Sequence, residues 1–444
     1  MNVKAINVML LFLCLIAGAS IAFYAPMGMY DLVTGAKADG FSVSWPGIRF
    51  FTEPFYALSF YSVTLDRGFY LPAIISWFGW VMIAVFTYCG IKKRTIVQCV
   101  SRTLYAVMML ATLFVLVALV PLPGPKLIKP ADYIAVDFHS HTINSHDNLS
   151  LPASNLRFHN YQGYDAFYIT EHNHTKGFEK FPQSAQYKKV FPGVQMATKD
   201  GVSVLLLSDK KFEGEEYKDL TLDEIINKAH QNNMLVIMPH WWKWHKQSME
   251  DLVKSGIDGF EIYNCGYRNF KQSEQNKMIE TVKKDNLLAA GSTDWHGWGY
   301  MTDVWTVFKA SSTANLTSQL AAKPEIKVIL YREKQSSSIV RFIFEPFAAF
   351  YYYMKNANAF SVISFMVWFA VIFMLALSYV TKYIKEYLPL FMMALFFISA
   401  LYFLVSYLPV RELNNIIPST VLPVCVGFCL LWFLVWRLNG KDIH

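Results

Sequence analysis

Residues 134–141 read Ile-Ala-Val-Asp-Phe-His-Ser-His, a short apolar run that ends in two histidines one residue apart. Such a run is typical of a buried β-strand, and in an extended chain His139 and His141 point the same way. A second stretch, Gly-Ser-Thr-Asp-Trp-His-Gly at 291–297, follows another apolar run and carries Asp294 and His296. The sequence therefore predicts that metal-binding residue types follow the carboxyl ends of strands.

Outward from these stretches, apolar runs alternate with amphipathic ones between about 131 and 335. Strands are expected at 134–138, 166–170, 202–207, 235–238, 259–263 and 288–291, and helices at 220–232 and 272–284. Alternation of β and α over this length predicts an α/β barrel or an open α/β sheet.

The histidines concentrate in this same region. Ten of the eleven lie between 139 and 296, and the exception is His444. Two further groups of histidine with a carboxylate or amide occur at 145–148 and 170–174, and His240 ends the run at 238–240. Imidazole and carboxylate are ligands of zinc, manganese and iron, and such folds keep their chemistry at the carboxyl ends of the strands. One shared metal site is therefore predicted, and the alternative is a set of unrelated core and surface histidines.

The order of these motifs resembles the PHP (polymerase and histidinol phosphatase) superfamily of metal-dependent phosphoesterases. The resemblance covers about 131–335 and rests on the segments 137–142, 145–147, 170–172, 191–195, 239–240, 260–264 and 292–297. It implies a distorted (β/α)7 barrel that holds up to three metals. In this chain that barrel is expected to be inserted between two groups of three transmembrane helices.

Two positions depart from the pattern of that family. Gln195 stands where a bridging glutamate is usual, and Ser203 stands where a histidine is usual. Because a neutral amide bridges cations poorly, we expect two divalent ions (zinc, manganese or iron) in place of three. The alternative is that these departures mark a catalytically inactive site.

The resemblance also assigns roles to individual residues. One metal would be held by His139, His141 and Asp294, and the other by Asp147, His172 and His296. His146 competes with Asp147 for the same role. Gln195 and His240 complete the expected ligand set, and His240 is also a candidate for contact with the substrate phosphate. Asp294, His240 and His174 are the expected catalytic residues, with His240 or His174 available to protonate the leaving group.

The flanking parts of the chain are predicted to cross a membrane. Of the 444 residues, 54% are hydrophobic and 16% are charged, against roughly 25% charged in a soluble domain. Six windows contain no charge, at 5–30, 68–91, 103–125, 356–381, 387–410 and 413–436. Since about 20 apolar residues cross a bilayer, we expect a membrane part at 1–128, a phosphoesterase domain at 129–335 and a second membrane part at 336–444. The first window is also compatible with a cleaved signal peptide.

Basic residues in short loops predict the orientation. Lys92, Lys93, Arg94 and Arg102 lie between the second and third windows, and further basic residues follow the fourth and the sixth. Because positive loops stay in the cytoplasm, both termini are expected there. The phosphoesterase domain would then face the periplasm from a bacterial inner membrane.

The membrane parts contain an internal repeat. Residues 49–61 and 341–353 are identical at seven of thirteen positions. Each copy precedes a predicted span, so we expect two interfacial helices and a parallel duplication. Arg49 and Arg341 are candidates to bind an anionic headgroup, and the alternative is an ion pair with Glu53 and Glu345 four residues on.

These features together predict hydrolysis of a phosphoester by metal-activated hydroxide. A membrane lipid or lipid-linked phosphate is the expected substrate and nucleic acid is not favoured, because no basic run is evident in the domain. Trp241 and Trp295 are candidates to stack on the substrate or to pack at the barrel mouth. The alternatives are a membrane-anchored periplasmic nuclease or nucleotidase, and a non-catalytic metal-binding transporter or scaffold.

Overall fold

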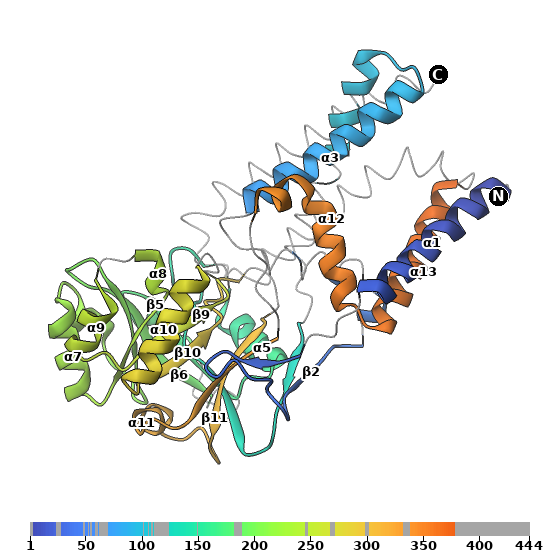
Figure 1. Ribbon diagram of the computed structural model, residues 1–444. Coiled ribbons are helices and arrows are strands. Elements are labelled where there is room, and N and C mark those ends of the chain that lie inside the picture. The colour runs from blue at the N-terminus through green and yellow to red at the C-terminus, as the bar shows by residue number, and fades with distance from the viewer. Residues whose placement is uncertain are drawn as a thin grey trace. The chain divides into compact units, whose positions relative to one another are not determined.

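The computed structural model divides into two compact units (Figure 1). Unit 1 comprises Met1–Pro26, Gly47–Leu122 and Ser336–His444, and unit 2 comprises Met27–Pro46 and Pro123–Gln335. The structure describes residues 3–23, 28–47, 49–51, 53, 56–57, 61, 70–100, 102–104, 106–107, 110, 124–148, 150–181, 189–244, 247–266, 271–297, 302–331 and 338–377.

Unit 2 is built on a mixed sheet with the strand order β1-β12-β11-β4-β5-β6-β7-β8-β9-β10. Its strands are β1 (Tyr30–Asp31), β4 (Tyr133–Asp137), β5 (Ala166–His172), β6 (Val190–Ala197), β7 (Ser203–Leu207), β8 (Leu235–Met238), β9 (Gly259–Asn264), β10 (Leu288–Ser292), β11 (Val304–Lys309) and β12 (Ile326–Leu330). The six strands expected from the sequence are all present, and the prediction of an α/β sheet is confirmed.

The pairing is only partly parallel. β4 to β6 and β8 to β10 pair in parallel, whereas β7 runs antiparallel to both neighbours. No ladder joins β10 to β4 in the described part of the chain, but an isolated bridge links Ser140 to Trp295. The Asp294 amide also donates to the His139 carbonyl at 2.8 Å. The sheet therefore curls until the ends of β4 and β10 meet, which is less than a closed (β/α)7 barrel.

Helices cover the sheet and complete its core. They are α5 (Pro152–Gln162), α6 (Lys176–Glu179), α7 (Leu222–Gln231), α8 (Trp241–Trp244), α9 (Met249–Ser255), α10 (Gln272–Lys284) and α11 (Leu316–Ala321). In α7, Leu222, Ile225, Ile226 and Ala229 follow helical spacing and pack against the buried strands β8 and β9. This burial fixes the strands at whose ends the polar residues lie.

Two short strands from the segment 27–46 also belong to unit 2. β1 pairs with β12, and β2 (Ser42–Ser44) pairs with β3 (Lys126–Ile128). Asp31 stabilises the pairing of β1 with β12, because its carboxylate accepts a hydrogen bond from the Val328 amide at 3.1 Å. Residues 27–46 thus lie with the sheet, whereas the expected boundaries gave them to the N-terminal membrane part.

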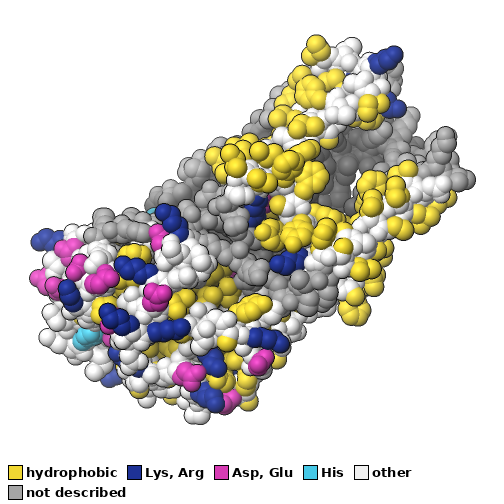
Figure 2. Space-filling model, in the orientation of Figure 1, with side chains coloured by type: hydrophobic (Ala, Val, Ile, Leu, Met, Phe, Trp, Pro, Cys, Tyr) yellow, Lys and Arg dark blue, Asp and Glu magenta, His cyan; other side chains and the backbone are white. Residues whose placement is uncertain are grey.

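Unit 1 contains α1 (Val3–Phe23), α3 (Tyr70–Ile91), α12 (Ile339–Asn356) and α13 (Ala359–Leu377). Among the described residues, Ile6–Phe23 and Leu71–Ile91 are long and apolar enough to cross a membrane, and Ala359–Val371 is a shorter apolar helix. Figure 2 shows hydrophobic side chains gathered over these helices. The expected spans at 387–410 and 413–436, and most of 103–125, lie outside the described residues.

The two copies of the repeat contact each other reciprocally within unit 1. Arg49 forms an ion pair with Glu53 at 2.6 Å, and Arg341 forms one with Glu345 at 2.7 Å. Each carboxylate also accepts a hydrogen bond from the other copy, from Tyr353 to Glu53 at 2.9 Å and from Tyr61 to Glu345 at 2.7 Å. The equivalent contacts support a duplication with approximate two-fold symmetry.

The same exchange extends to the helices that follow each copy. The Trp80 indole N–H donates to the carbonyl of Ile343 at 2.7 Å, and Trp368 donates to the carbonyl of Phe51 at 2.8 Å. Phe51 and Ile343 occupy the same position of the repeat. Each copy is therefore completed by a helix of the other, which the sequence alignment alone did not reveal.

Candidate metal centre

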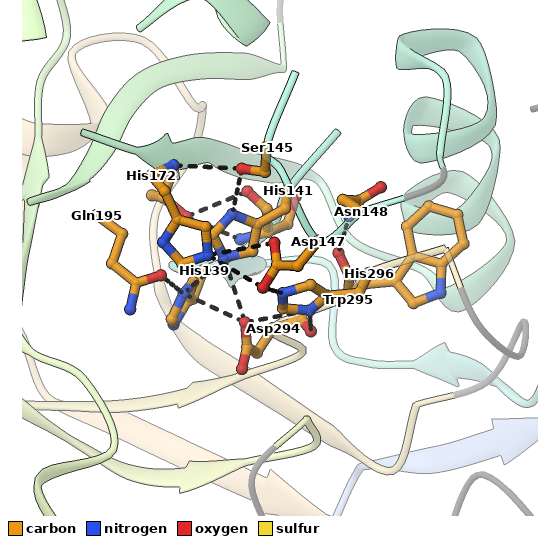
Figure 3. Close-up of polar contacts among 12 residues, drawn as sticks. His139, His141, Ser145, Asp147, Asn148, His172, Gln195, Asp294, Trp295 and His296 are labelled. Carbon is orange, nitrogen blue, oxygen red and sulfur yellow. Dashed lines mark hydrogen bonds and ion pairs between the residues drawn. The ribbon is translucent and has the colours of Figure 1, made fainter. Parts of the chain in front are cut away.

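The first group of candidate ligands lies where β4 and β10 end (Figure 3). The Nε2 atoms of His139 and His141 are 3.0 Å apart, and Asp294 Oδ1 lies 3.3 Å from each of them. Two ligands of a tetrahedral zinc ion, each about 2.0–2.1 Å from the metal, lie roughly 3.3 Å apart. The three atoms therefore have the spacing of a ligand set. All three side chains are buried.

Each ring is hydrogen-bonded through its Nδ1 atom, which leaves its Nε2 atom available to bind a metal. His139 Nδ1 faces Glu261 Oε1 at 3.2 Å and donates to it. His141 Nδ1 donates to Ser145 Oγ at 3.1 Å, because the Ser145 hydroxyl itself donates to Glu171 at 2.5 Å. In the neutral rings both Nε2 atoms then carry lone pairs that point at each other, an arrangement that a cation between them relieves.

The surroundings of Asp294 independently suit a metal ligand. Its Oδ2 atom is buried and has no hydrogen-bond partner in the part of the chain that is described. Its backbone is also left-handed, with φ of 46°, a conformation that is costly for residues other than glycine. A buried, unsatisfied carboxylate oxygen at a strained position fits a metal ligand.

The second group lies beside the first. Asp147 is 3.3 Å from His172 Nε2 and 3.2 Å from His296 Nε2. His296 Nδ1 donates to the carbonyl of Asp294 at 2.6 Å, so its Nε2 is again the free nitrogen of the neutral ring. The ligand atoms of His141, His172 and His296 all lie within 4.8 Å of one another, which makes the two groups a continuous cluster.

His146 and Asp147 are both near this second group. His146 is exposed, and its ring lies 4.9 Å from that of His172. Asp147 contacts two histidines and the His146 ring is tilted against one of them, so the geometry favours Asp147 as the ligand while His146 remains within reach.

Gln195 and His240 also lie beside His139, and the ligand atoms of His139, His240 and Asp294 lie within 4.8 Å of one another. Gln195 Oε1 is 3.2 Å from His139 Nε2, and its amide nitrogen is 3.1 Å from His240 Nε2. The amide thus spans the two imidazoles, where a carboxylate would have added negative charge. His240 has a left-handed backbone with φ of 29°, and its amide is held by Glu261 at 2.9 Å.

The charges of the cluster shift its protonation equilibria. Burial disfavours charge on His139, but Asp294 and Glu261 outweigh it and raise the pKa of His139 to about 9. Burial lowers the pKa of His141, and the neighbouring His296 and His139 lower it further. Burial opposes ionisation of Asp294, yet His139 and His296 hold its pKa well below its usual range. Without a metal, one proton on His139 therefore balances Asp294.

Two carboxylates behind the ligands were not assigned a role from the sequence. Glu261 holds both the His139 ring and the His240 amide. Glu171 accepts from Ser145 and Thr142, and burial raises its pKa to about 7 although those hydrogen bonds lower it. Both sit inside quoted motifs, but only the fold shows that they face the ligand rings from behind.

The remaining predicted site residues lie in varied surroundings. His174 is partly buried and its Nε2 contacts the carbonyl of Asn144 at 3.1 Å. Trp295 is buried and stacks on Phe158 with centroids 4.3 Å apart, and Trp241 is buried and donates to the carbonyl of Gln247. Arg49 and Arg341 lie in unit 1 within the ion pairs described above. Their roles toward a substrate stay predictions.

Comparison with protein-family models and with curated proteins gives no match. Among solved structures, PsfC from Pseudomonas syringae is 15% identical, with a TM-score of 0.36 over 50% of this chain and 98% of its own. A Bacteroides vulgatus protein containing a predicted PHP-like metal-dependent phosphoesterase is 17% identical, with a TM-score of 0.33 over 48% and 69%. Endonuclease Q, bound to a 27-mer duplex with an abasic lesion, is 12% identical, with a TM-score of 0.35 over 44% and 58%. Scores this low establish neither a shared fold nor a shared activity.

One expectation from the sequence is corrected here. A lipid-linked partner was expected and nucleic acid was disfavoured, but Endonuclease Q was solved with a duplex DNA substrate. The prediction against nucleic acid is therefore withdrawn. The absence of a basic run is weak evidence against nucleic acid, because a site that binds a phosphoester through metal ions does not need a run of basic residues.

Proposed function

We propose that this chain is a metal-dependent phosphoesterase, a hydrolase acting on ester bonds, whose active centre is the His/Asp cluster of unit 2. The proposal rests on one observation: the Nε2 atoms of His139 and His141 and the Oδ1 atom of Asp294 lie 3.0–3.3 Å from one another. Hydrogen bonds at Nδ1 hold both histidine rings in this orientation. The order of the surrounding motifs resembles the PHP superfamily and supports phosphorus as the electrophile.

The residues of the chain divide into two candidate metal sites. His139, His141 and Asp294 would hold one divalent ion, and Asp147, His172 and His296 the other. When bound, such ions lower the pKa of a water molecule toward neutrality and neutralise charge on phosphoryl oxygens. Zinc, manganese and iron all suit this donor set.

The protein itself contributes orientation and proton handling. Glu261 and the Ser145–Glu171 pair hold two rings in one tautomer and limit their rotation. His240, next to Gln195 at the edge of the cluster, and His174 are the imidazoles we assign to protonation of the leaving group. The substrate class is left to experiment, and a lipid-linked substrate is not carried forward.

We further propose that unit 1 embeds the protein in a membrane as a multi-pass anchor, with the metal centre outside the cytoplasm. The pairing of β2 with β3 supports the multi-pass anchor, because these two strands flank the segment 47–122 and place both of its ends at one two-stranded sheet. That segment would then cross the bilayer an even number of times. α3 is apolar enough for one crossing, and the charge-free window at 103–125 is the span expected from the sequence for the return.

The test is phosphate release by the full-length protein in detergent, with manganese or zinc added, over a panel of mononucleotides, oligonucleotides and lipid phosphates. Asp294→Ala and His139→Ala should abolish turnover on every substrate that the wild type hydrolyses. His230→Ala is the matched control, because that histidine is 42% exposed and pairs with Asp258. Unchanged turnover in Asp294→Ala would refute the assignment.

A further inference from the structure

The two candidate metal sites differ in their exposure to solvent. The inner site consists of His139, His141 and Asp294, and the outer site consists of Asp147, His172 and His296. All three side chains of the inner site are buried. In the outer site, the side chain of Asp147 is 43% exposed and that of His172 is 22% exposed. An ion of the outer site can therefore exchange with solvent more readily than an ion of the inner site.

The side chains of the two sites also differ in how firmly they are held. Both inner histidine rings are hydrogen-bonded at Nδ1, to Glu261 and to Ser145. Among the described residues, Nδ1 of His172 has no hydrogen-bond partner, and the carboxylate of Asp147 forms polar contacts only with the two outer histidines. His172 and Asp147 can therefore rotate without breaking a side-chain hydrogen bond to the rest of the protein.

A further histidine lies beside the outer site. His146 is exposed, and its ring lies 4.9 Å from the ring of His172. Within the described part of the chain, its ring nitrogens form no hydrogen bond or ion pair. The ligand atoms of His146, Asp147 and His172 nevertheless all lie within 4.8 Å of one another. A solvated surface histidine would not need this proximity to two candidate ligands.

Two overlapping ligand sets therefore share Asp147 and His172. In one set the third ligand is His296, which is 8% exposed and is held through Nδ1 by the carbonyl of Asp294. In the other set the third ligand is the exposed His146. Since the ligands of a tetrahedral zinc ion lie roughly 3.3 Å apart, the second set must contract around an ion, and its unrestrained side chains permit this. An ion can pass between the two sets by exchanging one imidazole for the other.

We propose that His146, Asp147 and His172 form an entry position for a divalent ion, through which the ion of the outer site enters and leaves the protein. Imidazole and carboxylate suit zinc, manganese and iron at this position as they do at the other two. The ion of the outer site then exchanges fast, and the ion of the buried inner site exchanges slowly. The inference rests on the proposed function only for the ligand roles of the inner and outer sites, and it does not depend on hydrolysis.

The experiment follows zinc release from the zinc-loaded full-length protein in detergent, by stopped-flow mixing with an excess of a chromogenic chelator. The wild type should release one ion in a fast phase and one in a slow phase. His146→Ala should slow the fast phase by about tenfold, which corresponds to about 1.4 kcal/mol at the barrier, and leave the slow phase unchanged. It should still bind two ions at equilibrium. The control is His230→Ala, which removes a 42% exposed histidine outside all three ligand sets and should release zinc like the wild type.

A second variant separates the loss of a ligand from any effect on folding. His146→Glu keeps a metal-binding side chain at the entry position and should restore most of the fast rate. A fast phase of wild-type rate in His146→Ala, or a single phase in the wild type, would overturn the inference. Loss of one ion from His146→Ala at equilibrium would also overturn it, because His146 would then be a permanent ligand. Release in two phases without any phosphoester hydrolysis would defeat the proposed function alone, and a wild type that binds no divalent ion would defeat both.

Discussion

The metal centre of unit 2 and the duplicated Arg–Glu–Tyr cluster of unit 1 are both buried groups of charge, but they are satisfied in opposite ways. In unit 1, each carboxylate receives an arginine from its own copy and a tyrosine from the other. In unit 2, histidine nitrogens and Asp294 converge within 3.0–3.3 Å, and one oxygen of Asp294 remains unpaired in the described chain. The charges of the first cluster are paired within the protein, whereas the second cluster has the geometry of a cation site. The contrast separates structural charge from functional charge more clearly than composition does.

The largest effect is expected from removing a carboxylate at the metal centre. Asp294→Asn should reduce the bound metal by about one ion per chain and lower turnover by more than about 100-fold, beyond the loss typical of residues behind the ligands. Elemental analysis and phosphate release measure the two effects. Full metal content in this variant would contradict the role of Asp294 as a metal ligand, and its carboxylate would then be a structural charge like those of unit 1.

Removing a carboxylate in unit 1 should affect folding and leave metal binding intact. Glu345→Ala leaves the buried Arg341 without its main counter-ion, which costs about 3–5 kcal/mol in comparable sites. Thermal unfolding in detergent should report this loss, and zinc affinity measured below the transition should not change. The control is Glu325→Ala, an 85% exposed residue whose loss should leave the unfolding transition unchanged. A large change in zinc affinity with unchanged unfolding would contradict the division of roles.

The proton on His139 gives the metal centre a pH dependence that the cluster of unit 1 lacks. The folded pKa of about 9 lies above the ordinary value of 6.5, so the metal-free protein holds this proton below about pH 9. A metal needs the neutral ring, so binding at pH 7 releases a proton and affinity rises with pH up to about 9. The stability of the metal-free fold has the opposite sign: the contribution of His139 is fully present below pH 6.5 and is lost as pH rises through about 9. Calorimetric titrations in buffers of different ionisation enthalpy measure the release, and identical heats in all buffers would rule it out.

The smallest expected effect tests the symmetry of the repeat. Tyr61→Phe and Tyr353→Phe each remove one hydrogen bond to a buried carboxylate, at a cost of about 1.5–3 kcal/mol. Because the two contacts are equivalent, the losses in thermal stability should agree closely. A loss confined to one variant would show that the duplication is not energetically symmetric.

Much of unit 2 could be predicted from the sequence because its strands are short apolar runs with polar ends. β8 and α10 begin and end at the expected residues, and the other expected strands differ by a few residues at their ends. The strands β6, β11 and β12 and the added β1 were not predicted. β1 is only two residues long and is stabilised by β12, some 300 residues away, so no local pattern marks it.

The candidate ligands were also accessible to sequence reasoning, since His-x-His and Asp-x-His at strand ends are local patterns. The residues that orient them were not. Glu261 and Glu171 act through contacts between residues that are far apart in the sequence. In unit 1 the ion pairs follow from an i, i+4 spacing, but the exchange of Tyr61 and Tyr353 between the copies requires the fold.

The most direct test of the account is the metal content of the full-length protein after purification and reconstitution with zinc or manganese. We predict two ions per chain in the wild type, about one in His139→Ala and about one in His296→Ala. We predict two in Arg341→Lys, which changes the charged cluster of unit 1. No bound metal in the wild type, or losses as large in Arg341→Lys as in the histidine variants, would contradict the assignment of the unit 2 cluster as a metal centre.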